Sequence, residues 1–544
     1  YEFWSAKTSN RGMGTSYAKN AVDKYTMFTL ENMLFYDKTF NDKHTLGVTL
    51  LQSIQEDKRE SVNVAMENLP ADNLKYYDLG SGLVTNTIGS SMIKWNMASF
   101  MGRINYNYLG RYLLTVSARY DGSSRLADGH KWVLFPSAAL AWRINEESFM
   151  SSTSGWLDNL KLRLGFGKTG NSAVDPYQTK GTLSLIRYPF DNGGTPTIGY
   201  APNAMANSLL TWETTDQWNL GIDFGVLRGR INGTIDLYMQ NTHDLLLKRQ
   251  LPVVSGFPDV LSNVGKTRNK GIEVSINSMN INSKDFQWTT DLMLSSNKEE
   301  IVELYNGKND DIGSKWFIGQ PVNVHYDYRK VGIWQNTESD LAEMAKFAAN
   351  GTEFAPGDIK IQDVNGDYKI TDADKQILGN PRPKLIASMV NTFNYKGFDL
   401  SVFLYASFGA MLYNDIYAVE HCGRNGGVKV DYWTPNNPTN AYPRPSIDEE
   451  RPIYITSTYY EKADFLRVKT MTLGYTLPKT LTNKFLVEKL RVYFTAQNPF
   501  IFTNYTGIDP EAAKVNSAGN PETNGSGFGT PSVSSWIFGI NLTL

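Results

Sequence analysis

The sequence is poor in residues that build disulfide or metal sites. Cys422 is its single cysteine, so an internal disulfide framework cannot form. The five histidines are scattered, and no pair of them has the spacing of metal ligands. The formal net charge is -2, and the blocks of like charge that are typical of nucleic-acid-binding tails are absent. The sequence therefore gives no support for a zinc site or for a nucleic-acid partner.

Long apolar runs and catalytic motifs are missing as well. No run reaches the roughly 18 apolar residues that a transmembrane helix needs. No serine or cysteine lies in a nucleophile-elbow context. Residues 165–170 match Gly-x-Gly-x-x-Gly, but Pro176 and polar turn residues follow where a nucleotide site requires a helix. We therefore predict that the protein is not an enzyme.

What the sequence does contain is alternation of apolar and polar residues. Leu490, Val492 and Phe494 share one face of a strand, and Arg491 and Tyr493 share the other. One polar face argues against a parallel sheet that is buried on both sides. Such strands are expected near residues 25–37, 43–56, 95–108, 111–121, 132–144, 158–168, 213–224, 230–244, 265–279, 285–297, 384–395, 397–408, 463–477, 488–497 and 533–544.

The connections between these strands alternate in length. The long ones fall near 57–94, 122–131, 169–212, 245–264, 298–383, 409–462 and 498–532. The short ones fall near 38–42, 109–110, 145–157, 225–229, 280–284, 396 and 478–487. Tyr106, Tyr108 and Tyr112 flank one short turn, as expected of rings at a membrane boundary. Short turns at one end and long loops at the other are typical of outer-membrane β-barrels. The fold class predicted is all-β, a transmembrane antiparallel β-barrel with short periplasmic turns and long extracellular loops.

Three blocks near the end of the chain carry a family resemblance. They read DFLRVKTMTLGYTLP, RVYFTAQNPF and TNYTGIDPE, in that order, within residues 464–511. Together they resemble the C-terminal signature of the SusC/RagA-like TonB-dependent transporters. The resemblance implies a 22-stranded barrel with an N-terminal plug, of which about fifteen strands are visible here. Residues 1–544 would then be the C-terminal portion of the barrel, with the plug and the first strands missing.

The same resemblance implies a function. Such barrels lie in the outer membrane of Bacteroidota-type bacteria, among its lipids, and import large nutrients under the control of TonB, which acts through the absent N-terminal region. A SusD-like surface lipoprotein covers them as a lid. We expect an oligosaccharide as the nutrient. The alternatives are a peptide importer of the same family, a surface adhesin or receptor barrel, and a secreted β-rich glycan-acting enzyme.

One long loop carries a candidate calcium site. Residues 363–374 read DVNGDYKITDAD, which offers hard oxygen ligands at the spacing of a calcium loop. Tyr368 departs from that pattern, because it stands where the sharp turn normally requires glycine. The alternative is a polar Asn-Gly turn. The ligands expected for Ca²⁺ are Asp363, Asn365, Asp367, Lys369 (through its carbonyl), Thr371 and Asp374.

Aromatic residues of the two longest loops are candidates for contact with substrate or lid. Rings can stack on sugar faces while neighbouring Asn, Asp and Arg side chains bind hydroxyl groups. For any one residue, packing between loops is the alternative. The candidates are Trp316, Trp334, Tyr413, Tyr432 and Trp433.

Overall fold

A computed structural model of the chain describes residues 1–11, 14–190, 197–414, 429–446, 451–511 and 531–544. The chain divides into two compact units. Unit 1 comprises Tyr1–Trp142, Leu164–Trp218 and Asn241–Lys266. Unit 2 comprises Arg143–Arg163, Asn219–Gln240 and Thr267–Leu544. Each unit is described by itself.

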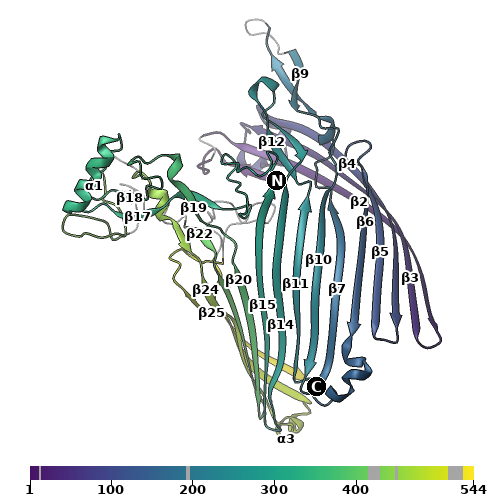
Figure 1. Cartoon of the computed structure of the whole chain (residues 1–544). Helices are drawn as coiled ribbons and strands as arrows, with labels where there is room; N and C mark the ends of the chain where they lie inside the picture. Colours follow the sequence, from purple (N-terminus) through teal and green to yellow (C-terminus); the bar gives the residue numbers. More distant parts are fainter. Residues whose placement is uncertain (12–13, 191–196, 415–428, 447–450, 512–530) are drawn as a thin grey trace. The chain divides into compact units, whose positions relative to one another are not determined.

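Long antiparallel strands dominate the structure (Figure 1). They belong to a 16-stranded sheet in which neighbours follow the order of the chain. In sequence these strands are β1 (Glu2–Trp4), β2 (Tyr17–Phe40), β3 (His44–Glu67), β4 (Val84–Tyr108), β5 (Tyr112–Ser123), β6 (Trp132–Arg143), β7 (Leu157–Asn171), β10 (Glu213–Val226), β11 (Ile231–His243), β14 (Lys266–Asn282), β15 (Phe286–Glu303), β20 (Leu385–Tyr395), β21 (Phe398–Phe408), β24 (Phe465–Thr476), β25 (Lys489–Thr503) and β26 (Ser535–Thr543).

The all-β, antiparallel prediction is confirmed, and each of the fifteen predicted strands corresponds to one of these. Strand β1 was not predicted, and the predicted ranges of β2, β3 and β4 are shorter than the strands in the structure. The reason is visible in the pairing of β2 with β3, which continues in register from Phe40↔His44 to Tyr17↔Glu67. Backbone hydrogen bonds extend a ladder past its apolar part, and the polar ends give no hydrophobic alternation to detect.

In unit 1 the two faces of the sheet differ in polarity. Phe100 of β4 is opposite Tyr120 of β5, which is opposite Leu134 of β6, and all three side chains are exposed. On the other face the guanidinium of Arg119 donates to Ser99 Oγ at 2.9 Å and pairs with Asp121 at 2.8 Å. An exposed apolar face opposite a polar face is the pattern of a strand between lipid and an aqueous lumen.

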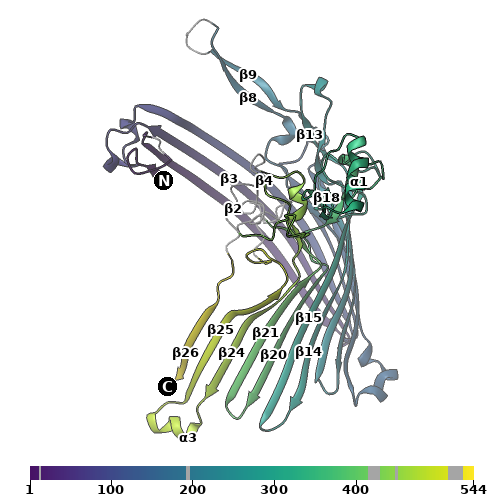
Figure 2. The ribbon, with the colours of Figure 1, turned by 90° about the vertical axis from the view of Figure 1, so that its left-hand side faces the viewer.

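Unit 2 repeats this division in β20, β21, β24, β25 and β26, which lie side by side in Figure 2. Leu400, Leu473, Phe494 and Phe538 occupy successive partner positions on one face. On the other face Arg491 Nε donates to Asp399 Oδ1 at 2.9 Å. Gly474 lies between these two side chains, and a Cβ there would be 2.4 Å from the Arg491 guanidinium. The glycine of the LGYTLP block therefore leaves room for an ion pair.

The long connections contain secondary structure that the sequence did not reveal. Residues 165–170, the glycine-rich match, lie within strand β7 and form no phosphate loop. Among the described residues, no helix is long and apolar enough to span a membrane. The elements of the connections are β8 (Thr182–Tyr188), β9 (Thr197–Ala204), β12 (Leu246–Gln250), β13 (Asp259–Asn263), β16 (His325–Tyr328), β17 (Lys330–Ile333), α1 (Glu338–Ala349), β18 (Ile359–Ile361), β19 (Lys375–Gly379), β22 (Met411–Tyr413), β23 (Tyr460–Lys462) and α3 (Lys479–Thr482).

Candidate functional site

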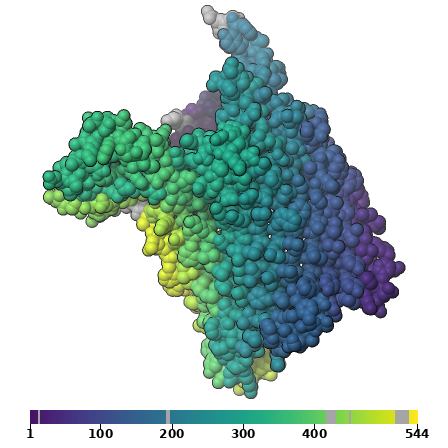
Figure 3. Space-filling view, in the orientation of Figure 1, coloured from purple at the N-terminus to yellow at the C-terminus, as the bar shows by residue number. Residues whose placement is uncertain are grey.

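The two longest connections of unit 2 fold into a region with its own core. We call residues 304–384 and 409–464 the loop region; residues 415–428 and 447–450 lie outside the described part of it. Its side chains gather in one continuous mass, green in Figure 3. The main buried cluster joins residues from both connections: Ile333, Ile359, Ile361, Trp433, Ile455 and Tyr459.

Helix α1 is held to this region by a second cluster. Thr337 caps the helix, because its side-chain oxygen accepts the N–H of Asp340. Met344 and Phe347 face inward and pack on Trp334, which has no exposed surface. The rings of Trp334 and Phe347 meet edge to face at 5.8 Å. An apolar stripe on one side of a short helix is thus buried by the ring of Trp334, which directly follows strand β17.

The five predicted contact residues have different environments. Trp334 and Trp433 are buried, as in the alternative of packing between loops. Trp433 also donates from Nε1 to Gln335 Oε1 at 2.9 Å. Tyr413 is half-buried against Tyr459 and Tyr460. The side chain of Tyr432 is 45% exposed, and Trp316 is half-buried like Tyr413, so these three keep surface that a ligand or lid could contact.

A hollow of about 570 Å³ opens beside these aromatic clusters. Phe354 and Tyr454 contribute aromatic surface to it. Arg444 and Asp358 also line it and pair through Nε and Oδ1 at 2.9 Å. Rings next to a carboxylate and a guanidinium can bind a polar, ring-shaped ligand, because the rings take its apolar face and the charged groups take its hydroxyls. Phe354, Asp358 and Arg444 were not among the residues predicted from the sequence.

The candidate calcium loop is closed by hydrogen bonds from its own backbone. Asp363 accepts the N–H groups of Gly366 at 2.7 Å and Tyr368 at 2.8 Å. Asp374 has no exposed surface and accepts the N–H groups of Val364 at 2.9 Å and Thr371 at 2.8 Å. Within the parts of the chain that the structure describes, no three His, Cys, Asp or Glu side chains group closely enough to hold a metal ion. Calcium binding stays a prediction.

Tyr368 shows how the loop turns without the expected glycine. Its φ is +58°, in the left-handed region that glycine normally supplies. The ring packs edge to face on Phe347 at 5.5 Å, and Lys346 Nζ lies 5.2 Å from its centroid. These contacts offset the cost of the left-handed backbone, which is about 1–3 kcal/mol for a non-glycine residue. Tyr368, which departs from the calcium pattern, therefore joins the loop to helix α1.

Buried and half-buried titratable groups connect the strands of the loop region. His325 donates from Nε2 to the carbonyl of Met411 at 2.8 Å, and its burial lowers the pKa of the imidazole. Tyr460 donates from Oη to Asp327 Oδ2 at 3.0 Å, and burial raises the pKa of that phenol. Burial also lowers the pKa of Lys330 to about 8, although its ammonium group donates to the carbonyl of Ala441. These contacts link β16 and β17 to the second long connection.

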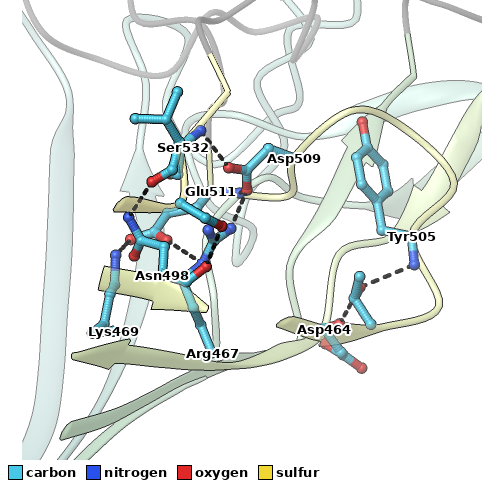
Figure 4. Close-up of polar contacts among 11 residues, drawn as sticks. Asp464, Arg467, Lys469, Asn498, Tyr505, Asp509, Glu511 and Ser532 are labelled. Carbon is cyan, nitrogen blue, oxygen red and sulfur yellow. Dashed lines mark hydrogen bonds and ion pairs between the residues drawn. The ribbon is translucent and has the colours of Figure 1, made fainter. Parts of the chain in front are cut away.

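A set of ion pairs fixes the base of the last long connection to β24 (Figure 4). Arg467 pairs with Asp509 at 2.5 Å and with Glu511 at 3.0 Å, and Glu511 also pairs with Lys469. Asp509 further accepts the N–H of Ser532 at 3.0 Å. Burial by itself raises the pKa of the Asp509 carboxyl, but hydrogen bonds from Glu511 and Ser532 and the Arg467 charge hold it below its ordinary value.

We call these residues the strap: Arg467, Lys469, Asp509 and Glu511. The side chains of Arg467 and Asp509 are each only 4% exposed, so this is a buried pair. In the sequence these residues stand within the blocks that carry the family resemblance, and no role was predicted for them. The signal that could have found them is an arginine at an inward position of an amphipathic strand, followed by an Asp-Pro-Glu turn.

Comparison with known proteins identifies the fold. Residues 1–499 match the family described as "TonB dependent receptor-like, beta-barrel". The chain belongs to this family. The TonB-dependent receptor P3 of Formosa agariphila is 32% identical over 531 residues, which are 94% of this chain and 52% of that protein. The TonB-dependent receptor SusC of Bacteroides thetaiotaomicron is 35% identical over 434 residues, which are 76% of this chain and 41% of SusC.

Solved structures agree on the fold of this TonB-dependent receptor barrel. The RagAB peptide transporter superposes with a TM-score of 0.81 at 22% identity, over 97% of this chain and 56% of that chain. The predicted likeness to SusC and RagA is thus confirmed. The family consists of transporters and receptors, not enzymes, and its barrels lie in the outer membrane, as does this one. The chain spans about half the length of the curated relatives it matches.

Proposed function

We propose that this chain forms the wall and outer loops of a TonB-dependent importer for a large nutrient. The observation that carries the proposal is the loop region, in which two long connections build one folded body with a hollow of about 570 Å³. A turn that only joins two strands needs no core of this kind. The fold family supports the energy source, because TonB-dependent receptors are its members.

Within this function we propose an oligosaccharide as the nutrient and a SusD-like lipoprotein as the lid. The chemistry of the hollow supports a sugar, since Tyr454 and Phe354 offer stacking surfaces beside the paired Asp358 and Arg444. A peptide is the second candidate, favoured by the likeness of the fold to the RagAB peptide transporter. An adhesin barrel would need no ligand in the hollow.

The test is binding and uptake by the full-length protein in its own membrane. We expect the importer to co-purify with a lipoprotein lid, to bind one class of oligosaccharide in calorimetry, and to lose that binding in an Arg444→Gln variant. Lys396→Gln, at a short turn, is the matched control. Binding of peptides but not of sugars would show that the nutrient is a peptide. Growth of a deletion strain unimpaired on every sugar and peptide tested would refute import.

We also propose that residues 363–374 bind Ca²⁺ and so stiffen the loop region. The donor set supports this, because Asp363, Asp367 and Asp374 each keep lone pairs beyond those that accept backbone N–H groups. Calcium prefers such hard oxygen donors on a short loop.

A further inference from the structure

A cavity of about 500 Å³ lies in unit 1, where one long strand extends past its neighbour. Strand β4 begins at Val84, but its pairing with β5 begins only at Met97. The edge of β4 before Met97 therefore has no strand partner on that side among the described residues. Trp95 and Asn96 are neighbours in β4 and point to opposite faces of the sheet. Both line the cavity, so the cavity wraps around this edge.

Two long connections close the cavity. They follow β5 and β7, and long connections face the outside of the cell in outer-membrane barrels. Ser124 of the first connection accepts the N–H of Asn96 through Oγ at 2.8 Å and donates its own N–H to the Asn96 carbonyl at 2.9 Å. Tyr177 of the second connection accepts the N–H of Lys94 through Oη at 3.2 Å. These two residues thus take the place of a neighbouring strand.

The walls of the cavity are tied to each other and to a buried core. Ala127 donates its N–H to the Leu210 carbonyl at 3.1 Å, and Trp212 Nε1 donates to the Lys131 carbonyl at 2.8 Å. Leu126 lines the cavity and packs with Leu210 and Trp212 in a buried cluster. The cavity is therefore formed in advance, and a ligand does not have to order its walls.

Tyr177 has an unusual backbone conformation at this place. Its φ is +72°, in the left-handed region that glycine normally occupies. Strained residues of this kind cluster at ligand sites, where the backbone places a functional side chain. Tyr177 is 48% exposed, so its ring is accessible to a ligand. A hydroxyl group donates as well as accepts, so the phenol that accepts from Lys94 can also donate its proton to a ligand.

The cavity carries more positive than negative charge. Three lysines line it together with a single aspartate, Asp128. Lys131 pairs with Asp128 at 2.5 Å, and its hydrogen bond together with the nearby charge of Lys180 lowers the pKa of that carboxyl. Lys94 pairs with Glu56 at 2.9 Å. Both carboxylates have much exposed surface, so these pairs contribute little to stability and a bound anion can replace them.

We propose that this cavity binds an acidic oligosaccharide through a carboxylate or a sulfate ester on one of its sugar rings. The volume falls in the range of ligand pockets, about 300–1,000 Å³. The three lysines attract the anion, and the rings of Trp95 and Tyr177 offer surfaces for stacking on a sugar. Asn96 and Ser208 supply hydrogen bonds for its hydroxyls. This inference rests on the proposed function, because it names acidic oligosaccharides as nutrients that the importer collects.

The experiment measures binding of three tetrasaccharides to the full-length protein by calorimetry. They are a galacturonate tetramer, a sulfated galactose tetramer and a neutral galactose tetramer, which have similar sizes and differ in charge. The readout is the ratio of the affinities for an acidic and the neutral tetramer, because a general loss of folding lowers both affinities alike.

The variants change lysines at exposed or half-buried positions. The test variant combines Lys94→Gln, Lys131→Gln and Lys180→Gln, which removes the positive charge of the cavity. The matched control combines three exposed lysines of the short connections, Lys43→Gln, Lys396→Gln and Lys479→Gln.

The wild type and the control should prefer an acidic tetramer by about tenfold to 100-fold, because each exposed ion pair contributes up to about fivefold. The test variant should lose this preference. The acidic tetramer that binds more tightly identifies the anion as a carboxylate or a sulfate. An equal preference in the test variant and the control would overturn the proposal, and so would inorganic sulfate that binds as tightly as the tetramers.

Failure of this inference can be told apart from failure of import. A protein that imports a neutral sugar or a peptide and shows no preference for the acidic tetramers would overturn this inference alone. A deletion strain that grows normally on acidic oligosaccharides, although the purified protein binds them in the cavity, would refute their import and leave the binding site standing.

Discussion

At the scale of single residues, burial separates those that build the loop region from those that can meet a ligand. Trp334 has no exposed surface, whereas Tyr432 of the same predicted set is 45% exposed. Both were selected from the sequence for the same reason, an aromatic ring in a long polar connection. Their roles differ because one ring lies beneath helix α1 and the other does not.

Substitution of these two residues should therefore give opposite results. Trp334→Ala should destabilise the fold around α1 by about 3–5 kcal/mol, because it removes a fully buried ring and leaves a cavity. Hydrogen exchange of residues 338–349 measures this loss. Tyr432→Ala should leave that exchange unchanged and weaken ligand binding. Unchanged protection in the Trp334 variant would contradict the packing described here.

The strap gives a second residue-scale prediction. Arg467→Met should destabilise the base of the last connection by about 3–5 kcal/mol, because Asp509 is left as a buried charge without its partner. Limited proteolysis between residues 503 and 535 reports the effect. The double variant Arg467→Met, Asp509→Asn removes the charge and should recover much of the resistance. Similar cleavage of the single and double variants would show that the charge pair is unimportant.

His325 should make the stability of the loop region depend on pH. Burial lowers its pKa, so the folded region holds the proton less tightly than the unfolded segment does. The stabilisation is therefore present above the ordinary histidine pKa of about 6.5 and is lost as the pH falls below it. Hydrogen exchange at β22 should accelerate below that pH. His325→Gln keeps a donor for the carbonyl of Met411 and should remove this pH dependence. If the exchange of the variant still depended on pH, another titratable group would be responsible.

At the scale of elements, the calcium loop and helix α1 form one piece through Tyr368. A loop with two left-handed residues, Gly366 and Tyr368, is held by side-chain oxygens that accept backbone N–H groups. Calcium would tighten the same oxygens around one centre. Its effect should then appear at the helix as well as in the loop.

Calcium binding is tested by thermal unfolding and exchange of the loop region with Ca²⁺, with Mg²⁺ and with chelator. We expect Ca²⁺ to protect residues 363–374 and α1, and Mg²⁺ to do so weakly, because it demands stricter octahedral geometry. Asp367→Asn should abolish the protection by Ca²⁺ while the chelated loop keeps its fold. Equal hydrogen exchange with Ca²⁺ and with chelator would show that the loop is a polar turn that binds no calcium.

At the scale of the whole molecule, both units show a face of exposed apolar side chains opposite a face of ion pairs. In lipid every backbone group of such a sheet must be paired within it. The full-length protein should accordingly remain folded in mild SDS and migrate faster before heating than after it. Purification without detergent as a soluble monomer would contradict the membrane assignment, whereas loss of nutrient binding alone would not.

The sequence by itself determined fifteen of the sixteen strands of the large sheet. The alternation in β21 and β25 and the unequal connections were sufficient, because hydrophobic period and chain length are local properties. Only the tertiary structure decided which loop residues are buried, which ones line the hollow and what Arg467 does. Those outcomes depend on contacts such as Trp433 with Gln335 and Arg467 with Asp509, which join residues 98 and 42 positions apart. No period in the sequence records such pairs, since each is made only when two connections fold against each other.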